Sequence, residues 1–190
     1  MQYPLFKQKA AEHFLILFTL PYGVVKFIKE QKKKVFENYG FYISHDSVPH
    51  ITLCTLKISP ERVDKIVCLL EKTLSTFPQL EVEINGFDSF ENTQVVYAKI
   101  ENEHIFMPFY EALKRFKSEH HINDSLTISS VPHITLAKMV WESQFKQVTE
   151  EYESRKYNSS FILQELKVLR YDEARMKYEE FGKSRLRKAS

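Results

Sequence analysis

The chain has few cysteines, no long hydrophobic run and almost no excess of charge, and each shortage excludes a class of protein. Cys54 and Cys68 are its only two cysteines. Two are too few for a disulfide framework, so we expect a reducing, cytoplasmic compartment. The apolar run Phe14–Phe18 is too short to span a bilayer, and no small-residue cleavage site follows it. We therefore expect neither a membrane anchor nor a signal peptide.

Charge and composition narrow the classes of protein that remain possible. Lys and Arg total 27 and Asp and Glu total 25, which leaves a formal net charge of +2. This near balance argues against a protein that coats DNA, although it leaves room for a local basic cleft. Hydrophobic residues make up 43% and aromatic residues 14% of the chain, as in globular proteins. Because no linker or low-complexity stretch interrupts residues 1–190, we expect one domain. We also expect a monomer.

One heptapeptide occurs twice in the chain. Ser-Val-Pro-His-Ile-Thr-Leu occupies residues 47–53 and returns at residues 130–136, which is 83 positions later. A single His-x-Ser/Thr triplet is expected about once by chance in such a chain. We interpret His45-Asp46-Ser47 as one such chance match. A seven-residue identity at one long spacing is rarely accidental, so the heptapeptides predict an internal repeat.

The order of predicted elements repeats at the same spacing. Apolar periodicity in the first half predicts strands at 13–20, 50–56 and 79–85, and helices at 21–36 and from 59 to about 77. In the second half it predicts strands at 95–100, 133–139, 161–169 and 175–181, and helices from about 104 to 117 and around 145–152. This alternation predicts an α+β fold of two intertwined lobes, about 13–86 and about 95–181, related by a pseudo-twofold axis. Residues 1–12 would form an N-terminal arm.

The repeated motif places chemically active side chains in a definite arrangement. Alternate residues of a strand share a face, so His50, Thr52 and Cys54 are predicted to lie on one face of the first motif strand. His133 and Thr135 are predicted to share a face of the second. A twofold axis would set the two His–Thr pairs facing each other across a central cleft.

Such an arrangement suits phosphoryl chemistry. Two histidines on opposite sides of a phosphorus can act as general base and general acid, because the unperturbed pKa of histidine allows both roles near neutral pH. Threonine hydroxyls can donate to the non-bridging phosphate oxygens. Neither motif offers a second metal ligand close to its histidine on the same face, so we predict no metal and no cofactor. Near-twofold symmetry leaves open which histidine is the base.

The two H-x-T motifs resemble those of the 2H phosphoesterase superfamily, in particular its 2′-5′ RNA ligase-like (LigT-like) or RNA 2′,3′-cyclic phosphodiesterase branch. The stretches HFLILFTLP, INGFDSF and HITLAK agree, and the resemblance extends from about His13 to Phe181. It implies a bilobal fold and metal-independent catalysis on RNA 2′,3′-cyclic phosphate or another cyclic or 2′-5′ phosphodiester. It also implies that His50 and His133 are catalytic and that Thr52 and Thr135 bind phosphate.

Other residues are weaker candidates for substrate contact. Many relatives carry Arg where this chain has Lys138, although regular strand alternation would point Lys138 away from the His133 face. Tyr42 is among the aromatic residues that could stack a base. Lys32-Lys33-Lys34 is interpreted as an exposed helix face.

Two other functions stay open at this point. One is a non-catalytic module that binds a phosphorylated or cyclic RNA end. The other is a cyclic phosphodiesterase of small nucleotides, so the expected partners are RNA ends or nucleotide cyclic phosphates. Two intact motifs favour an enzyme, because binding alone would not require two proton-transfer groups.

Overall fold

The computed structural model of the protein describes residues 10–123, 125–139 and 141–188. Most of the predicted N-terminal arm, residues 1–9, lies outside the described residues. The described residues form a nine-stranded sheet in the order β7-β3-β4-β6-β2-β1-β8-β9, and β5 also pairs with β2. Neighbouring strands in this order are antiparallel. The predicted α+β class is confirmed.

The bounds of the elements follow the apolar periodicity of the sequence closely. The strands are β1 (Glu12–Thr19), β2 (His50–Ile58), β3 (Leu80–Phe90), β4 (Val95–Ile100), β5 (Leu126–Ile128), β6 (His133–Lys138), β7 (Asn158–Leu163), β8 (Glu165–Asp172) and β9 (Lys177–Arg185). The α-helices are α1 (Tyr22–Tyr39), α2 (Val63–Ser75), α3 (Met107–Glu119) and α4 (Glu142–Glu153). Short 3₁₀ segments occupy Pro60–Arg62, Glu91–Thr93 and Glu103–Phe106.

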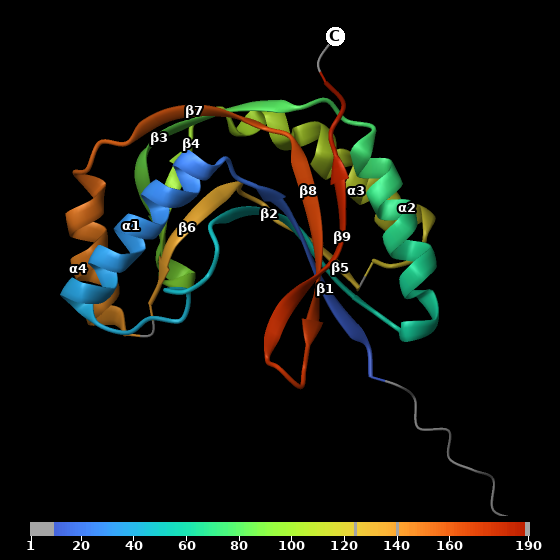
Figure 1. The fold of residues 1–190 in the computed structure, drawn as a ribbon, viewed down its shortest axis with the longest axis horizontal. Coiled ribbons are helices and arrows are strands. Elements are labelled where there is room, and N and C mark those ends of the chain that lie inside the picture. Colours follow the sequence, from blue (N-terminus) through green and yellow to red (C-terminus); the bar gives the residue numbers. More distant parts are fainter. Residues whose placement is uncertain (1–9, 124, 140, 189–190) are drawn as a thin grey trace, which may run out of the picture.

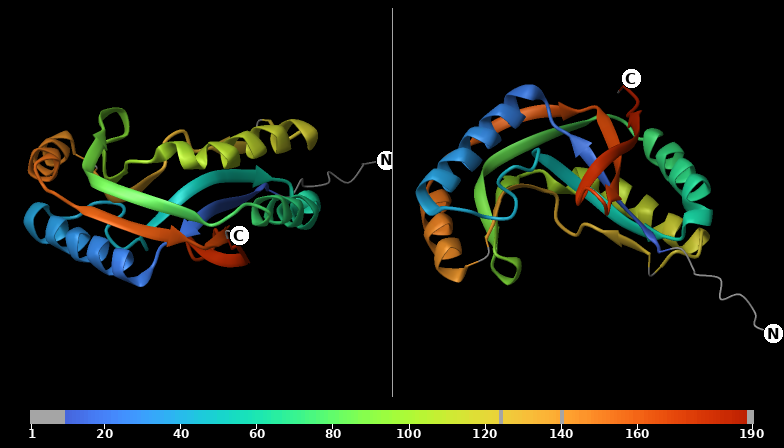
Figure 2. Two further views of the ribbon diagram at one scale, coloured as in Figure 1. Left: turned by 90° about the horizontal axis from the view of Figure 1, so that it is seen from above. Right: turned by 60° about the horizontal axis from the view of Figure 1, so that its bottom comes forward.

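The helices form two pairs at opposite ends of the sheet. Helices α1 and α4 lie side by side over β3, β4 and β6, whereas α2 and α3 lie together near β5 and β9 (Figures 1 and 2). Helix α1 lies between β1 and β2 in the chain but packs against β6, the strand of the second motif. Each end of the sheet therefore contains elements from both halves of the sequence.

A pseudo-twofold axis passes between the two central strands. The recorded pair between β2 and β6 joins Ile51 to Ile134, which are equivalent residues of the two heptapeptides. Outward from this pair the sheet continues with β1 and β4, then β8 and β3, then β9 and β7. The strands on the two sides of this pair therefore match in order and direction, apart from β5, which pairs with β2.

The predicted repeat spacing of 83 residues does not extend to β1 and β4, the strands that flank the motif strands. Leu17 of β1 lies opposite Thr52, and Tyr97 of β4 lies opposite Thr135. Leu17 and Tyr97 are therefore structural equivalents although they are 80 positions apart. Leu17 precedes Thr52 by 35 positions, whereas Tyr97 precedes Thr135 by 38, so the connection is longer in the second half. The repeat is therefore one of fold rather than of fixed register.

One side of the sheet packs against the helices and forms the core. In β1, Phe14, Ile16 and Phe18 are buried on this side, and Phe18 meets the rings of Phe106 and Phe109 edge to face at 5.7 and 5.3 Å between ring centroids. Full burial of such side chains stabilises the fold by roughly 1.5–3 kcal/mol each. The alternate residues of each strand face away from the helices.

The predicted single strand at 161–169 is wrong. The structure divides this segment at Gln164 into β7, which pairs with β3, and β8, which pairs with β1. Within one residue the chain thus crosses from the edge strand β7 to β8, which lies in the other half of the sheet. Strand β5 was not predicted, because three residues are too few to show a period.

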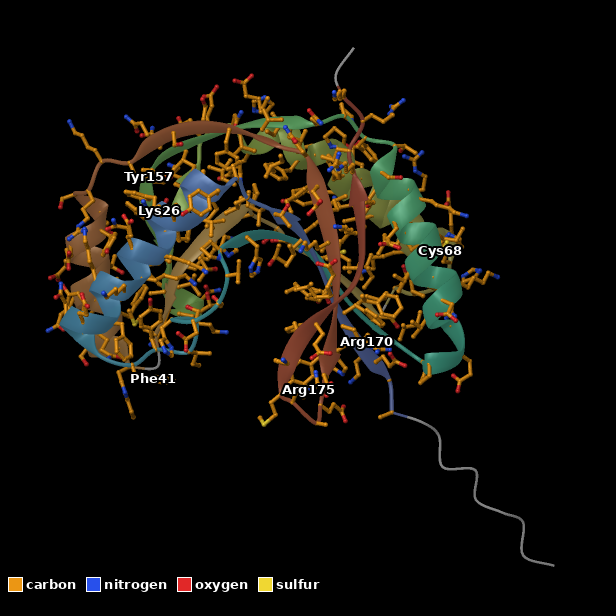
Figure 3. The ribbon with its side chains drawn as sticks, viewed as in Figure 1. Lys26, Phe41, Cys68, Tyr157, Arg170 and Arg175 are labelled. Carbon is orange, nitrogen blue, oxygen red and sulfur yellow. The ribbon has the colours of Figure 1, made fainter. Side chains whose placement is uncertain are left out.

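The structure also shows the state of the two cysteines and the character of the helices. Cys54 is buried and Cys68 is exposed on α2 (Figure 3), and both are free thiols. None of the helices in the described part of the chain combines the length and the apolar character needed to span a bilayer.

Candidate active site

Each motif strand contains a β-bulge directly after its threonine, and the first lies in β2. Thr52 and Cys54 lie opposite consecutive residues of β1, so Leu53 is the extra residue. A bulge reverses the alternation of side chains beyond it. Leu53 and Cys54 are both fully buried, while Thr55 is exposed. The prediction that Cys54 shares the face of His50 is therefore wrong, and Thr55 takes that place.

The second bulge lies at the equivalent position in β6. Thr135 and Ala137 lie opposite consecutive residues of β4, so Leu136 is the extra residue. The prediction that Lys138 points away from His133 is wrong for this reason. The β4 partners of His133, Thr135 and Lys138 are every second residue of a regular strand, so all three side chains share one face. Lys138 is exposed on that face.

The register between β2 and β6 brings the two motifs together. The recorded pair joins the two motif isoleucines, which are fully buried on the helix side. Continuing the antiparallel register sets His50 beside Thr135 and Thr52 beside His133 on the opposite side. All four side chains are half-buried. The structure therefore brings together the two histidines and two threonines that the sequence singled out.

Both imidazole rings are held in the same way. Nδ1 of His50 lies 2.7 Å from the carbonyl oxygen of Val48, and Nδ1 of His133 lies 2.8 Å from that of Val131. A carbonyl only accepts, so Nδ1 must carry the hydrogen and donate it. Each neutral ring then has its lone pair on Nε2, the nitrogen left free to exchange a proton with a ligand.

Burial sets the protonation of the two rings. It lowers the pKa of His50 and of His133, because the charged ring loses hydration. The hydrogen bond to Val48 or Val131 opposes this shift by favouring the protonated ring. The positive charges of Lys32 and His133 lower the pKa of His50 further. A lowered pKa keeps each ring neutral, and so able to accept a proton, over a wider range of pH.

The surroundings of the two histidines differ. His133 meets Phe90 edge to face at 5.0 Å and Tyr97 at 5.3 Å, and these two rings stack on each other at 4.3 Å. At the His50 side, Leu17 occupies the place of Tyr97. Burial raises the pKa of Tyr97 to about 12, so its hydroxyl stays protonated. Sequence reasoning missed Tyr97, although its place in a strand beside the second motif was a usable signal.

The expectation that Tyr42 stacks a base is wrong. Tyr42 is fully buried, and its hydroxyl donates to the backbone carbonyl of Lys32 at 2.9 Å. Burial raises the pKa of this phenol well above its usual range. Tyr42 therefore fastens the segment 40–49 to α1 and has no face to offer a ligand.

Metal-binding residues are not gathered at this site. Within residues 10–123, 125–139 and 141–188, no group of three or more His, Cys, Asp or Glu side chains is placed to hold a metal ion. The chemistry available from the side chains present is proton transfer by two imidazoles, hydrogen bonding by two hydroxyls and attraction of an anion by Lys138.

An antiparallel sheet in which two H-x-T strands meet at a pseudo-twofold axis defines the 2H phosphoesterase class. The comparison with protein families agrees, since residues 22–175 match the 2′-5′ RNA ligase superfamily. The chain belongs to this superfamily.

Relatives and solved structures support the same assignment. A Staphylococcus haemolyticus protein named as a phosphoesterase is 27% identical over 137 residues, which cover 69% of this chain and 76% of that protein. The structure of TT0787 from Thermus thermophilus has a TM-score of 0.69 and 20% identity, and the match covers 94% of this chain and 100% of that one. E. coli LigT complexed with NADP+ has a TM-score of 0.67 and 17% identity, with 93% and 98% covered. The two structures show the fold.

Proposed function

We propose that this protein is a metal-independent phosphoesterase that hydrolyses the 2′,3′-cyclic phosphate at an RNA end. The observation that carries the proposal is the matched pair of His50 and His133 on one face of the sheet. Each ring has Nδ1 bound to a carbonyl and Nε2 free. Two such groups, related by a twofold axis, suit a reaction that needs one proton removed and another delivered.

The proposed reaction balances without a further reactant. One neutral imidazole accepts a proton from water at Nε2 while the water oxygen bonds to phosphorus. The bond from phosphorus to one ribose oxygen breaks, and the other histidine, protonated at Nε2, gives its proton to that oxygen. Thr52 and Thr135 donate to the non-bridging oxygens, where charge accumulates in the transition state. The products are a ribose hydroxyl and a phosphomonoester.

Proteins of the same fold bind ligands of the expected chemistry. Structures of E. coli LigT are described as complexes with phosphate, 3′-AMP and ATP. These ligands all carry phosphate, and two are nucleotides, which supports a nucleotide phosphoester as substrate. The family resemblance further suggests that the 3′ oxygen leaves, so that the product is a 2′-phosphate.

Lys138 is the proposed contact for the RNA chain. Its side chain is exposed on the face of His133, and its backbone N–H donates to the Ser44 hydroxyl at 3.0 Å, which fastens the end of β6. An exposed ammonium attracts a phosphate as a point charge. A second nucleotide would supply such a phosphate, so Lys138 would favour an oligonucleotide over a mononucleotide.

A panel of substrates in the presence of EDTA tests the proposal. The panel contains nucleoside 2′,3′-cyclic phosphates and short RNAs that end in a 2′,3′-cyclic phosphate. We expect turnover that does not change with excess chelator and a higher kcat/KM for the RNAs. Lys138→Ala should raise KM for the RNAs more than for the nucleosides, whereas Lys65→Ala, which changes an exposed lysine of α2, should change neither.

Each contrary outcome would favour a different alternative mechanism or function. Activity lost in EDTA and restored by a divalent ion would contradict the metal-independent mechanism. Preference for mononucleotides would favour a small-molecule phosphodiesterase. Binding of RNA ends without product would favour the non-catalytic module.

A further inference from the structure

Lys32 is the one charged residue among the buried residues of α1, which also include Val24, Ile28, Gln31 and Val35. It is only 2% exposed, whereas Lys33 and Lys34 are exposed as the sequence predicted. Its Nζ donates to the carbonyl of Ser44 at 2.8 Å, to the carbonyl of Ser47 at 3.0 Å and to the hydroxyl of Ser47 at 2.7 Å. These three bonds use all three ammonium hydrogens. A buried lysine with every donor satisfied has a specific structural task.

The bonds of Lys32 end on the segment that carries the first histidine. Ser47 is the first residue of the heptapeptide, and the next residue, Val48, supplies the carbonyl that holds Nδ1 of His50. The Tyr42 hydroxyl bonds the Lys32 carbonyl and attaches the same segment to α1 a second time. The position of the Val48 carbonyl, and hence of the His50 ring, therefore depends on Lys32.

The second motif is held by a neutral group instead. There the Ser129 hydroxyl donates to the Val131 carbonyl at 3.3 Å, the same carbonyl that receives Nδ1–H of His133. Lys99 of β4 lies opposite His133, yet the pKa of His133 is lowered by burial and not by a neighbouring charge. The two histidines thus have matching geometry but unequal electrostatic surroundings.

We propose that Lys32 is a positioning residue that makes the two histidines unequal, so that His50 is the neutral general base and His133 the protonated general acid. The ammonium of Lys32 fixes the carbonyl that orients His50 and disfavours a second positive charge on that ring. This assignment of roles rests on the proposed hydrolysis.

The charges around the pair agree with this direction. Lys32 is among the causes that lower the pKa of His50, together with burial and His133. Burial and neighbouring Lys29 lower the pKa of Lys32 itself to about 8, against the pull of Asp46, which pairs with His45. Lys32 is therefore still mostly charged at neutral pH. Removing its charge should raise the pKa of His50 and leave that of His133 unchanged.

An NMR titration of the histidine ring protons tests the inequality without any need for turnover. Signals of the two rings are assigned with His50→Gln and His133→Gln. In the wild-type protein, His50 should titrate at a lower pH than His133. Lys32→Met, which removes the charged Nζ but keeps an unbranched side chain of similar length, should raise the pKa of His50 alone. Lys33→Met removes an exposed charge one residue away and should move neither histidine.

The pH profile of kcat/KM tests the assigned roles. With Lys32→Met, the acidic limb should move to higher pH while the alkaline limb stays in place. Below that limb, kcat/KM falls about tenfold for each pH unit of displacement. Lys32→Arg, which keeps the charge, should keep the limb near its wild-type position. A uniform loss at every pH, with His50 unmoved, would show a purely structural role and overturn the proposal.

If Lys32→Met does not fold, the order in which His50 and His133 titrate in the wild-type protein still tests the proposal. His133 titrating below His50 would overturn the proposal. The predicted order in a protein that turns over no substrate would support the electrostatic role of Lys32 and contradict the proposed hydrolysis.

Discussion

Replacing either His50 or His133 by alanine should lower kcat/KM on an RNA 2′,3′-cyclic phosphate by about 10²–10⁴-fold, the scale of a general acid or base. Each ring lies on the open face of a central strand and makes one hydrogen bond, to a backbone carbonyl. Its loss should therefore spare the fold while it removes one of the two proton transfers. Steady-state kinetics, with circular dichroism to verify folding, measures the effect.

The double replacement of His50 and His133 should be little worse than the poorer single replacement. Groups that act as one unit are strongly non-additive, because the first loss already prevents the concerted step. His104→Ala removes an exposed histidine from the 3₁₀ segment before α3 and serves as the control, with no expected effect. Full activity in either single variant would refute the assignment.

Replacing Thr52 or Thr135 by alanine should weaken transition-state binding by about 1–4 kcal/mol, from a typical hydrogen bond to a strong oxyanion donor. Each hydroxyl lies beside the histidine of the other motif, where the phosphate must sit between the two rings. Both changes should lower kcat more than they raise KM, because charge on the phosphate oxygens increases in the transition state.

Serine replacements separate the hydroxyl from the rest of the threonine side chain. Thr52→Ser and Thr135→Ser keep the donor and should be milder, although the lost methyl group frees the rotamer. Thr55→Ala is the matched control, because Thr55 lies on the same face of β2 beyond the bulge. If serine and alanine have equal effects, the hydroxyl is not the functional group.

The placement of the motif side chains was more predictable from sequence than that of the residues around them. In each heptapeptide the histidine and the threonine are two residues apart, and both precede the bulge. Alternation along a strand therefore sufficed to place His50 with Thr52, and His133 with Thr135, on one face. The bulges at Leu53 and Leu136 could not be placed in this way. No glycine or other special residue marks them, so the reversal that brings Lys138 to the site appears only in the pairing with β4.

Lys32 and Tyr42 show where local patterns conflict with the fold. A run of three lysines favours an exposed helix face, and two of them are exposed. Lys32, however, falls four residues after Ile28 on the buried face, where the neighbouring segment supplies its three acceptors. The helical period was present in the sequence, but the acceptors come from tertiary contacts that no local pattern contains.

The central claim is that this pair of histidines hydrolyses a cyclic phosphodiester without a metal. The most direct measurement is phosphorus NMR of a short RNA ending in a 2′,3′-cyclic phosphate, incubated with the protein in excess EDTA. The account predicts that the cyclic signal disappears and that one product, the 2′-phosphate, replaces it. A clean 3′-phosphate would contradict the direction of ring opening while keeping the mechanism. A cyclic signal that persists at every pH, although the RNA binds, would contradict the account.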